Sequence, residues 1–272
     1  MKTFKLFVIC LMTILCVRCM PLNYYQEYKA TFSENMAVKN NLIVFQDDNC
    51  KVYYNLWAEN GDIGFQFYNN TNRNIYLNME HTFLVLNGMA NNYFKNRTFT
   101  TSQNSGEIIS NMTRLSKSLT GVNYQNLLQT NQVTSSNKMG VISSSGYSIS
   151  YNEDKIICIP PFSSKLISEY SINNVRYQSC DLYKYPDKRS INTVSFTKEN
   201  SPVTFSNRIE YFFDSKDEPI LIKNDFYVTD ITNYPENEFI IDKYDIICDK
   251  KSETTTRHFK NPAPDKFYLI YK

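Results

Sequence analysis

Residues 51–88 read KVYYNLWAENGDIGFQFYNNTNRNIYLNMEHTFLVLNG and contain short runs rich in Val, Ile, Tyr and Phe. Such runs, separated by polar segments with Asn, Asp and Gly, are typical of strands. Asn60-Gly61 and Asn87-Gly88 favour hairpin turns, because both residue types tolerate a positive φ. Apolar and polar residues alternate in 64–68, as expected for a sheet with one face in water. The stretch therefore predicts strands at 51–57, 63–68, 74–77 and 82–86.

The same pattern extends over most of the chain. Further runs that predict strands lie at 42–45, 148–151, 155–159, 165–172, 191–196, 208–213, 220–229, 238–247 and 267–271. Pro160-Pro161 and Tyr185-Pro186-Asp187 are expected to end strands, and 214–217 to form the turn of a hairpin. Many short strands with almost no helix indicate an all-β fold. We expect an elaborated antiparallel β-sandwich in a single domain over residues 34–272.

A long insertion is expected at about residues 100–146, where about half of the residues are Ser, Thr or Asn. Part of it is expected to be helical, because apolar side chains with helical spacing occur at Ile108, Met112, Leu115 and Leu119. Two interpretations remain open. The segment is a loop or lid that contacts a partner, or a solvated insertion with a small helix packed on the sheet.

The first 19 residues, MKTFKLFVICLMTILCVRC, differ from the rest of the chain. Lys2 and Lys5 precede an apolar run over 6–17, which is the pattern of a secretory signal peptide. The run is too short to span a bilayer comfortably, and no later stretch predicts a transmembrane span. The alternative is a buried N-terminal helix or strand.

The site of cleavage decides how the exported chain is retained. Val17-Arg18-Cys19 fits signal peptidase I, with cleavage before Met20. Cys19 also lies at the right distance beyond the apolar run to be the acylated first residue of a lipoprotein, although Arg18 is a poor fit to that pattern. Spacing leaves both open, and in the second case residues 20–33 would be a tether.

The net charge argues against two kinds of partner, nucleic acid and anionic membrane surfaces. Lys2, Lys5 and Arg18 leave with the signal peptide, so the formal net charge falls from +2 to −1. A near-neutral chain with interspersed charges lacks the basic footprint of a nucleic-acid-binding protein or of a protein that binds anionic membranes.

Five stretches resemble a family of uncharacterised exported proteins from gut Bacteroidales: NYYQ (23–26), NCKVYYNLW (49–57), FYNNTNRNIYL (67–77), YFKNRT (93–98) and FSNRI (205–209). The similarity extends over most of the chain after the signal peptide. Such proteins often have the features of lipoproteins, so the resemblance implies acylation at Cys19 and a place in the cell envelope, at the outer membrane. It implies no activity.

Four cysteines follow Cys19, and an even number in an exported chain suggests two disulfides. Of the possible connectivities we favour Cys158 with Cys180 and Cys50 with Cys248. The alternative is that all four are free, buried thiols. No C-x-x-C spacing occurs, which argues against a thioredoxin-like redox site or a zinc knuckle.

Catalytic signatures are missing from the sequence. It has no G-x-G-x-x-G, P-loop, G-x-S-x-G, H-E-x-x-H or EF-hand pattern, so no cofactor, metal or catalytic residue is expected. Only two histidines occur, His81 and His258, and each is interpreted as a structural or surface residue. A glycosidase needs only two carboxylates, so an enzyme remains an alternative. Acidic residues in turns or on strand surfaces are Glu59, Asp62, Asp154, Glu169, Asp225 and Asp230.

Aromatic residues offer one candidate contact surface. Trp57, Tyr53, Tyr54 and Tyr68 could stack on a sugar or anchor a protein partner. The alternative is that these side chains belong to a pleated, half-buried sheet surface.

Together the patterns predict an exported, lipid-anchored protein of the cell envelope that acts as a binding or structural module, with a protein or glycan partner. A first alternative is a fimbrial or adhesin-like subunit, which would donate or accept a strand. A second is a carbohydrate-active enzyme, which would need acidic residues converging in a cleft.

Overall fold

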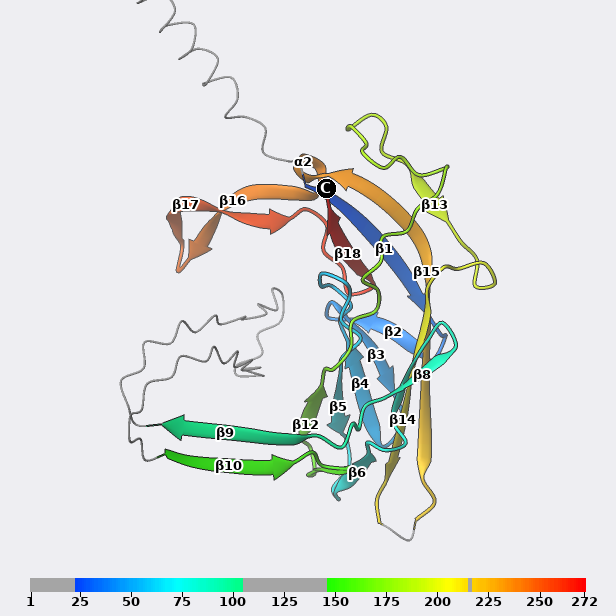
Figure 1. Cartoon of the computed structure of the whole chain (residues 1–272), viewed down its shortest axis with the longest axis vertical. Coiled ribbons are helices and arrows are strands. Elements are labelled where there is room, and N and C mark those ends of the chain that lie inside the picture. Colours follow the sequence, from blue (N-terminus) through cyan, green and yellow to red (C-terminus); the bar gives the residue numbers. More distant parts are fainter. Residues whose placement is uncertain (1–22, 105–145, 215–216) are drawn as a thin grey trace, which may run out of the picture. The chain divides into compact units, whose positions relative to one another are not determined.

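The computed structural model describes residues 23–104, 146–214 and 217–272 (Figure 1). It is 55% strand and 2% helical, and its sheets are antiparallel, which confirms the all-β prediction. The chain divides into two compact units. Unit 1 contains Met1–Tyr93 and Ile156–Lys272, and unit 2 contains Phe94–Lys155. The single domain expected over 34–272 is therefore interrupted by a separate unit, which includes the predicted insertion.

Unit 1 has a nine-stranded sheet as its largest element. Its main path runs β11 (Ile156–Ile159), β6 (Ile75–Asn78), β14 (Thr204–Phe212), β15 (Ile220–Pro235), β1 (Tyr24–Phe32) and β18 (Lys266–Tyr271). Three short strands join this path at its sides: β7 (Phe83–Leu86), β8 (Met89–Asn92) and β13 (Thr193–Ser195).

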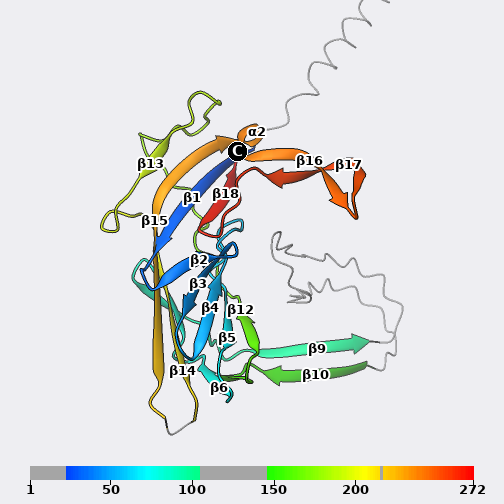
Figure 2. The same ribbon diagram turned by 180° about the vertical axis from the view of Figure 1, so that it is seen from behind.

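The 16-residue strand β15 organises this sheet and curves along its length (Figures 1 and 2). Its first half pairs with β14, from Ile220 to Tyr227. Its second half pairs with β1, from Phe226 to Pro235. The β14–β15 turn contains a hydrogen bond from Asp217 N to Asp214 O, which confirms the hairpin expected at 214–217. The two ends of β15 thus lie at opposite ends of the sheet.

A second, five-stranded sheet in unit 1 has the order β12 (Ser164–Ile167), β5 (Phe65–Asn69), β4 (Cys50–Tyr54), β3 (Leu42–Gln46) and β2 (Met36–Lys39). Burial alternates residue by residue along β4 and β5, as expected for strands with one covered face. The covered face carries Val52, Tyr54, Phe65 and Phe67, all buried.

Side chains of the two sheets contact each other. The ring centroids of Tyr54 and Phe226 are 5.2 Å apart, and those of Phe67 and Tyr211 are 5.6 Å apart. Buried polar groups also connect the sheets, since Asn224 Nδ2 donates to Tyr54 Oη at 2.8 Å. Burial raises the pKa of the Tyr54 hydroxyl, so this group stays neutral. The core thus combines aromatic packing with paired polar groups.

The prediction of a tether at 20–33 is wrong, because most of these residues form strand β1. Residues 24–32 pair with β15 on one side and residues 24–29 pair with β18 on the other, so they form a strand inside the largest sheet. Tyr28 is fully buried and stacks on Phe267, with 4.7 Å between ring centroids. Residues 25–28 are buried on both faces of the strand, whereas Lys29 is exposed, so the first half of YYQEYKATF lacks the alternation of a half-exposed strand.

The two Asn-Gly turns have different outcomes. Asn87 (φ 48°) and Gly88 (φ 82°) form the tight β7–β8 hairpin that the sequence predicts. Asn60 and Gly61 also have positive φ, but they lie in a longer connection between β4 and β5. There Asn60 N donates to Tyr268 O, so this turn packs against β18.

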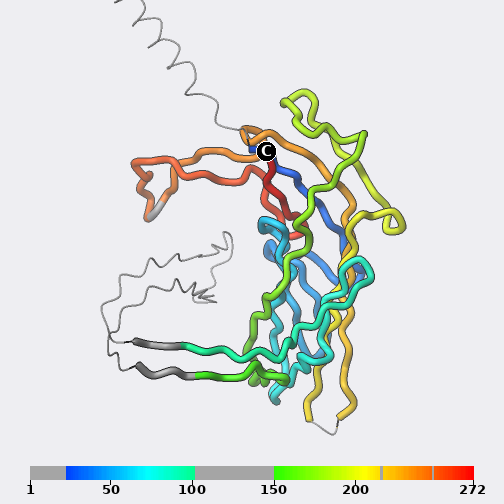
Figure 3. Tube along the Cα trace, in the orientation of Figure 1, coloured from blue at the N-terminus to red at the C-terminus, as the bar shows by residue number. Residues whose placement is uncertain are grey.

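A short helix and a hairpin follow β15. The helix α2 (Glu236–Phe239) leads into β16 (Ile240–Ile247) and β17 (Lys250–Phe259) (Figure 3). Phe239 packs in a buried cluster with Tyr25 and Trp57, and partly buried side chains surround them. No helix in the described part of the chain is long and apolar enough to cross a membrane.

Unit 2 contains a two-stranded ribbon, β9 (Thr98–Asn104) and β10 (Gly146–Asn152). Glu153 connects the two segments that lead into this ribbon. Its Oε2 accepts hydrogen bonds from the amides of Lys95 and Arg97, and its Oε1 forms an ion pair with the Arg97 guanidinium. The helix expected around 108–119 lies outside the described residues.

Candidate functional site

The predicted aromatic surface does not form. Tyr54 and Trp57 are buried, at 1% and 8% exposure. Tyr53 and Tyr68 are half-buried on the outer face of the five-stranded sheet, opposite to the face that carries Tyr54. Adjacent residues of a strand point to opposite faces, which separates Tyr53 from Tyr54. The alternative, a pleated and half-buried sheet surface, describes Tyr53 and Tyr68, whereas Tyr54 and Trp57 belong to the core.

The disulfide prediction is wrong. Among the described residues Cys50, Cys158, Cys180 and Cys248 are free, and none lies at disulfide distance from another. Cys50 is fully buried on β4, whereas the other three are exposed. Burial raises the pKa of the Cys50 thiol, which makes it unreactive.

Both histidines lie at the surface of unit 1. His81 Nδ1 lies 2.9 Å from Glu210 Oε1, and His258 Nε2 lies 3.1 Å from Asp245 Oδ1. No group of three or more His, Cys, Asp or Glu side chains that could hold a metal ion occurs in residues 23–104, 146–214 and 217–272.

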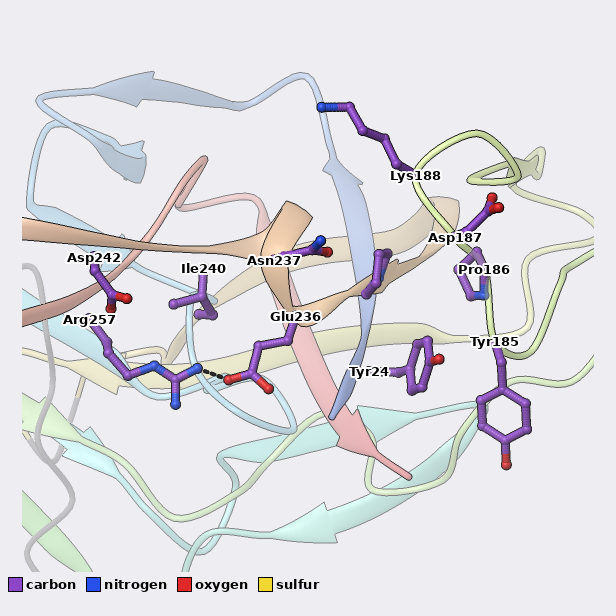
Figure 4. Close-up of a pocket in the computed structure, with 11 residues that line it drawn as sticks. Tyr24, Tyr185, Pro186, Asp187, Lys188, Glu236, Asn237, Ile240, Asp242 and Arg257 are labelled. Atoms are coloured by element: carbon purple, nitrogen blue, oxygen red, sulfur yellow. Dashed lines mark hydrogen bonds and ion pairs between the residues drawn. The ribbon is translucent and has the colours of Figure 1, made fainter. Parts of the chain in front are cut away.

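A cavity of about 590 Å³ in unit 1 is the candidate functional site (Figure 4). It lies where the start of β1, the helix α2 and the base of the β16–β17 hairpin meet a loop at 185–188. None of the acidic residues singled out from the sequence lines it. Its lining comprises Tyr24, Tyr185, Pro186, Asp187, Lys188, Pro235, Glu236, Asn237, Ile240, Asp242 and Arg257.

One wall of the cavity is aromatic. The ring centroid of Tyr24 lies 5.1 Å from that of Tyr185 and 5.7 Å from that of Tyr271. Tyr185 is 51% exposed, although its hydroxyl donates to Lys272 O at 3.2 Å. Tyr271 Oη donates to Lys184 O, which ties the C-terminal strand to the loop. These bonds hold the rings in place before any ligand arrives.

The other wall is charged. Arg257 forms an ion pair with Glu236, and Asp242 lies beside them (Figure 4). The 185–188 loop, which carries Tyr185, adds two further charged groups, Asp187 and Lys188 (Figure 4). Lys188 pairs with Glu238 at 3.2 Å between Nζ and Oε1. Hydrogen bonds from the Ser190 side chain and amide lower the pKa of Asp187, so its carboxylate stays ionised at neutral pH. The wall therefore presents both signs of charge next to the tyrosine rings.

Local sequence explains how α2 places Glu236 here. Pro235 has no amide hydrogen and ends the long strand β15, and a single helical turn follows. Glu236 N donates to Asn23 O at 3.2 Å, which joins this turn to the start of β1. Phe239 stacks on Tyr25 at 4.6 Å between ring centroids and fixes the turn from below. The buried Trp57 thus supports the cavity through this cluster instead of lining it.

Sequence reasoning missed this site. Tyr185-Pro186-Asp187 predicts only the end of a strand, and residue 24 falls within the expected tether. The cavity draws its lining from four separate segments, and no single segment has a recognisable motif. The weak signal available was the run of Pro, Glu and Asn at 235–237, which interrupts an otherwise β-forming stretch.

Chemically, the cavity suits a ligand with an apolar or ring face and polar groups of either charge. Tyr24 and Tyr185 offer rings, while Arg257, Lys188 and three carboxylates offer hydrogen bonds. Comparisons with protein-family models, curated proteins and solved structures found no match to this chain.

Proposed function

We propose that this protein is an exported envelope protein, lipid-anchored at Cys19, that acts as a binding module through the cavity between β1, α2, the β16–β17 hairpin and the 185–188 loop. The observation that supports binding is the pairing of a pre-ordered tyrosine wall with a charged wall. The signal-like segment and the resemblance to exported lipoproteins support the anchor. We also infer a sandwich arrangement of the two main sheets from the aromatic contacts that join them.

Ligand-induced stabilisation tests the binding role. A ligand at 100 times its Kd raises the free energy of unfolding by about 2.7 kcal/mol. The mature chain is screened by thermal unfolding against a panel of soluble glycans and peptides, together with vesicles. We expect at least one class to raise the melting temperature, and Arg257→Gln to abolish that rise.

Lys223→Gln is the matched control, because Lys223 forms a surface ion pair with Asp225 away from the cavity. Its melting temperature is expected to rise with the ligand as in the native chain. Stabilisation that survives Arg257→Gln, or that is lost equally in the control, would contradict the assignment of the cavity as the binding site.

A carbohydrate-active enzyme is the second candidate, favoured by the presence of Asp187, Glu236 and Asp242 in one cavity. Glycoside hydrolysis requires two carboxylates that act as acid and base or nucleophile. Turnover of chromogenic glycosides that falls by orders of magnitude in Glu236→Gln or Asp242→Asn would establish it. Binding without turnover would instead support the proposal that the protein is a binding module.

A further inference from the structure

The first residues that the structure describes lie at the cavity. Asn23 O accepts a hydrogen bond from Glu236 N, and the next residue, Tyr24, lines the aromatic wall. Cys19 precedes Asn23 by four residues, which span at most about 14 Å when fully extended. An acyl chain on Cys19 therefore holds the cavity within a short distance of the membrane surface.

Tyrosines gather at the same place. We use the name tyrosine cluster for Tyr24, Tyr185 and Tyr271, whose rings contact one another. Tyrosine combines an apolar ring with a polar hydroxyl, and for that reason it is enriched where protein meets the membrane–water interface. Pro186 and Pro235 extend this apolar rim along the cavity.

Cationic side chains accompany the rings. Arg176 lies over Tyr271, 4.9 Å from the ring centroid, and Lys184 lies over Tyr185 at 4.6 Å. Long basic side chains beside aromatic residues reach headgroup phosphates while their stems cover apolar surface. The carboxylates of Glu236 and Asp242 lie across the cavity. This mixture of charges matches a zwitterionic headgroup, which carries both a phosphate and an ammonium, better than an anionic one.

The end of β15 opposite to the cavity is preceded by acidic residues. Pro235 lines the cavity, whereas Ile220 begins the strand, and 15 steps of about 3.3 Å make about 50 Å of strand between them. The turn before Ile220 carries Asp214, Asp217 and Glu218. Figures 1 and 2 show the start of β15 at the end of unit 1 remote from the C-terminus and α2. The tyrosine cluster and the acidic turn thus lie at two ends of one sheet.

We propose that the cavity and the tyrosine cluster dock on the headgroup layer of zwitterionic phospholipid in the leaflet that holds Cys19. The proposal names the partner of the same site and rests on the proposed function through the lipid anchor. In this arrangement β15 points away from the membrane and presents Asp217 and Glu218, which precede the strand, to the surroundings.

Lipid quenching at two positions tests the docking. Cys158, Cys180 and Cys248 are replaced by Ser, and a single new cysteine is introduced by Asn237→Cys at the cavity or by Glu218→Cys at the acidic turn. Buried Cys50 does not react with the dye. The acylated protein is placed in phosphatidylethanolamine/phosphatidylcholine vesicles with a headgroup-linked quencher. We expect several-fold stronger quenching of a dye at position 237 than at position 218.

A tether near residue 23 alone brings this end towards the bilayer, so a variant pair separates docking from tethering. Tyr185→Ala removes a ring of the cluster, whereas Tyr183→Ala removes an exposed tyrosine outside it. The contrast between positions 237 and 218 is expected to fall markedly in Tyr185→Ala and to persist in Tyr183→Ala. Equal quenching at the two positions, or a contrast unchanged by Tyr185→Ala, overturns the docking.

The same measurement on a chain that begins at Met20, with an N-terminal histidine tag on nickel-chelating vesicles, keeps the two proposals distinguishable. Absence of acyl mass on the native protein contradicts the anchor, and the tagged chain still reports on docking. If a soluble glycan stabilises the protein and neither preparation shows a quenching contrast, the proposal of docking on the membrane is wrong. The proposal that the protein is a binding module is then retained.

Discussion

Glu27 on β1 and Lys266 on β18 form an ion pair with 3.2 Å between Oε1 and Nζ, and the Glu27 carboxylate is almost completely buried. Burial raises the pKa of Glu27 above its ordinary value of 4.5, and Lys266 offsets only part of this effect. The pair lies between the cavity end of β1 and its bulge at Lys29/Ala30. Desolvation therefore outweighs attraction at this position.

A pH dependence of stability follows from Glu27. A carboxyl group with a raised pKa in the folded state binds its proton more tightly there than in the unfolded chain, so its contribution is present at low pH and is lost as pH rises above 4.5 through the folded pKa. The slope from one group is at most about 1.4 kcal/mol per pH unit. Urea unfolding of Glu27→Gln from pH 4 to 7 is expected to lack this fall. Parallel curves for the two proteins would contradict the assignment.

The buried cluster under α2 predicts a large loss of stability. Tyr25 stacks on Phe239, with ring centroids 4.6 Å apart, and is 5% exposed. Removal of such a ring costs about 3–5 kcal/mol. Tyr25→Ala is expected to lower the free energy of unfolding in urea by that amount, whereas Tyr53→Ala, on a half-buried outer face, is expected to cost much less. Similar losses would show that the cluster is not a core.

Alanine substitutions at two glycines separate the cost of backbone strain from the cost of steric overlap. Gly61 and Gly88 both have positive φ, which costs an Ala about 1–2 kcal/mol. A Cβ on Gly61 would also lie 2.8 Å from Ile172 Cδ1 and 2.9 Å from Phe267 Cγ, whereas a Cβ on Gly88 meets nothing within 4 Å. Chemical unfolding is expected to show Gly61→Ala to be the more destabilised by about 1–3 kcal/mol. The reverse order would refute the contact of this turn with β18.

The free cysteines predict how the melting temperature responds to a reductant and which thiols a reagent modifies. Because the described cysteines are free, dithiothreitol is expected to leave the melting temperature of the mature chain unchanged. A thiol reagent is expected to modify Cys158, Cys180 and Cys248 in the native protein, and Cys50 only after unfolding. Mass spectrometry of the labelled peptides measures this. A melting temperature that drops in reductant would restore the disulfide hypothesis.

Strands and local turns could be predicted from the sequence because their signals are local. The alternation at 64–68 and the Asn87-Gly88 turn identify β5 and the β7–β8 hairpin. Burial is a different matter, because alternation shows that a strand has two faces without showing which face another element covers. For that reason the sequence leaves open whether Trp57 and Tyr54 form a contact surface, although both lie in the core.

The candidate site could not be predicted for a topological reason. Tyr24 and Tyr185 meet only because β1 and the 185–188 loop converge at one end of unit 1, and Arg257 reaches Glu236 only because a hairpin returns to α2. The disulfide prediction failed because the parity of cysteines carries no information on distance. The tether prediction failed because polar residues of β1, Gln26 and Glu27, are buried inside a sheet, which their side-chain types do not indicate.

We propose that the protein is anchored at Cys19 beside its binding cavity. Intact-mass and N-terminal analysis of the mature protein from membrane and soluble fractions, with Cys19→Ala in parallel, tests it most directly. We expect a membrane-associated chain that begins at Cys19 and carries acyl mass, which Cys19→Ala loses. A soluble chain that begins at Met20 without acyl mass would contradict it.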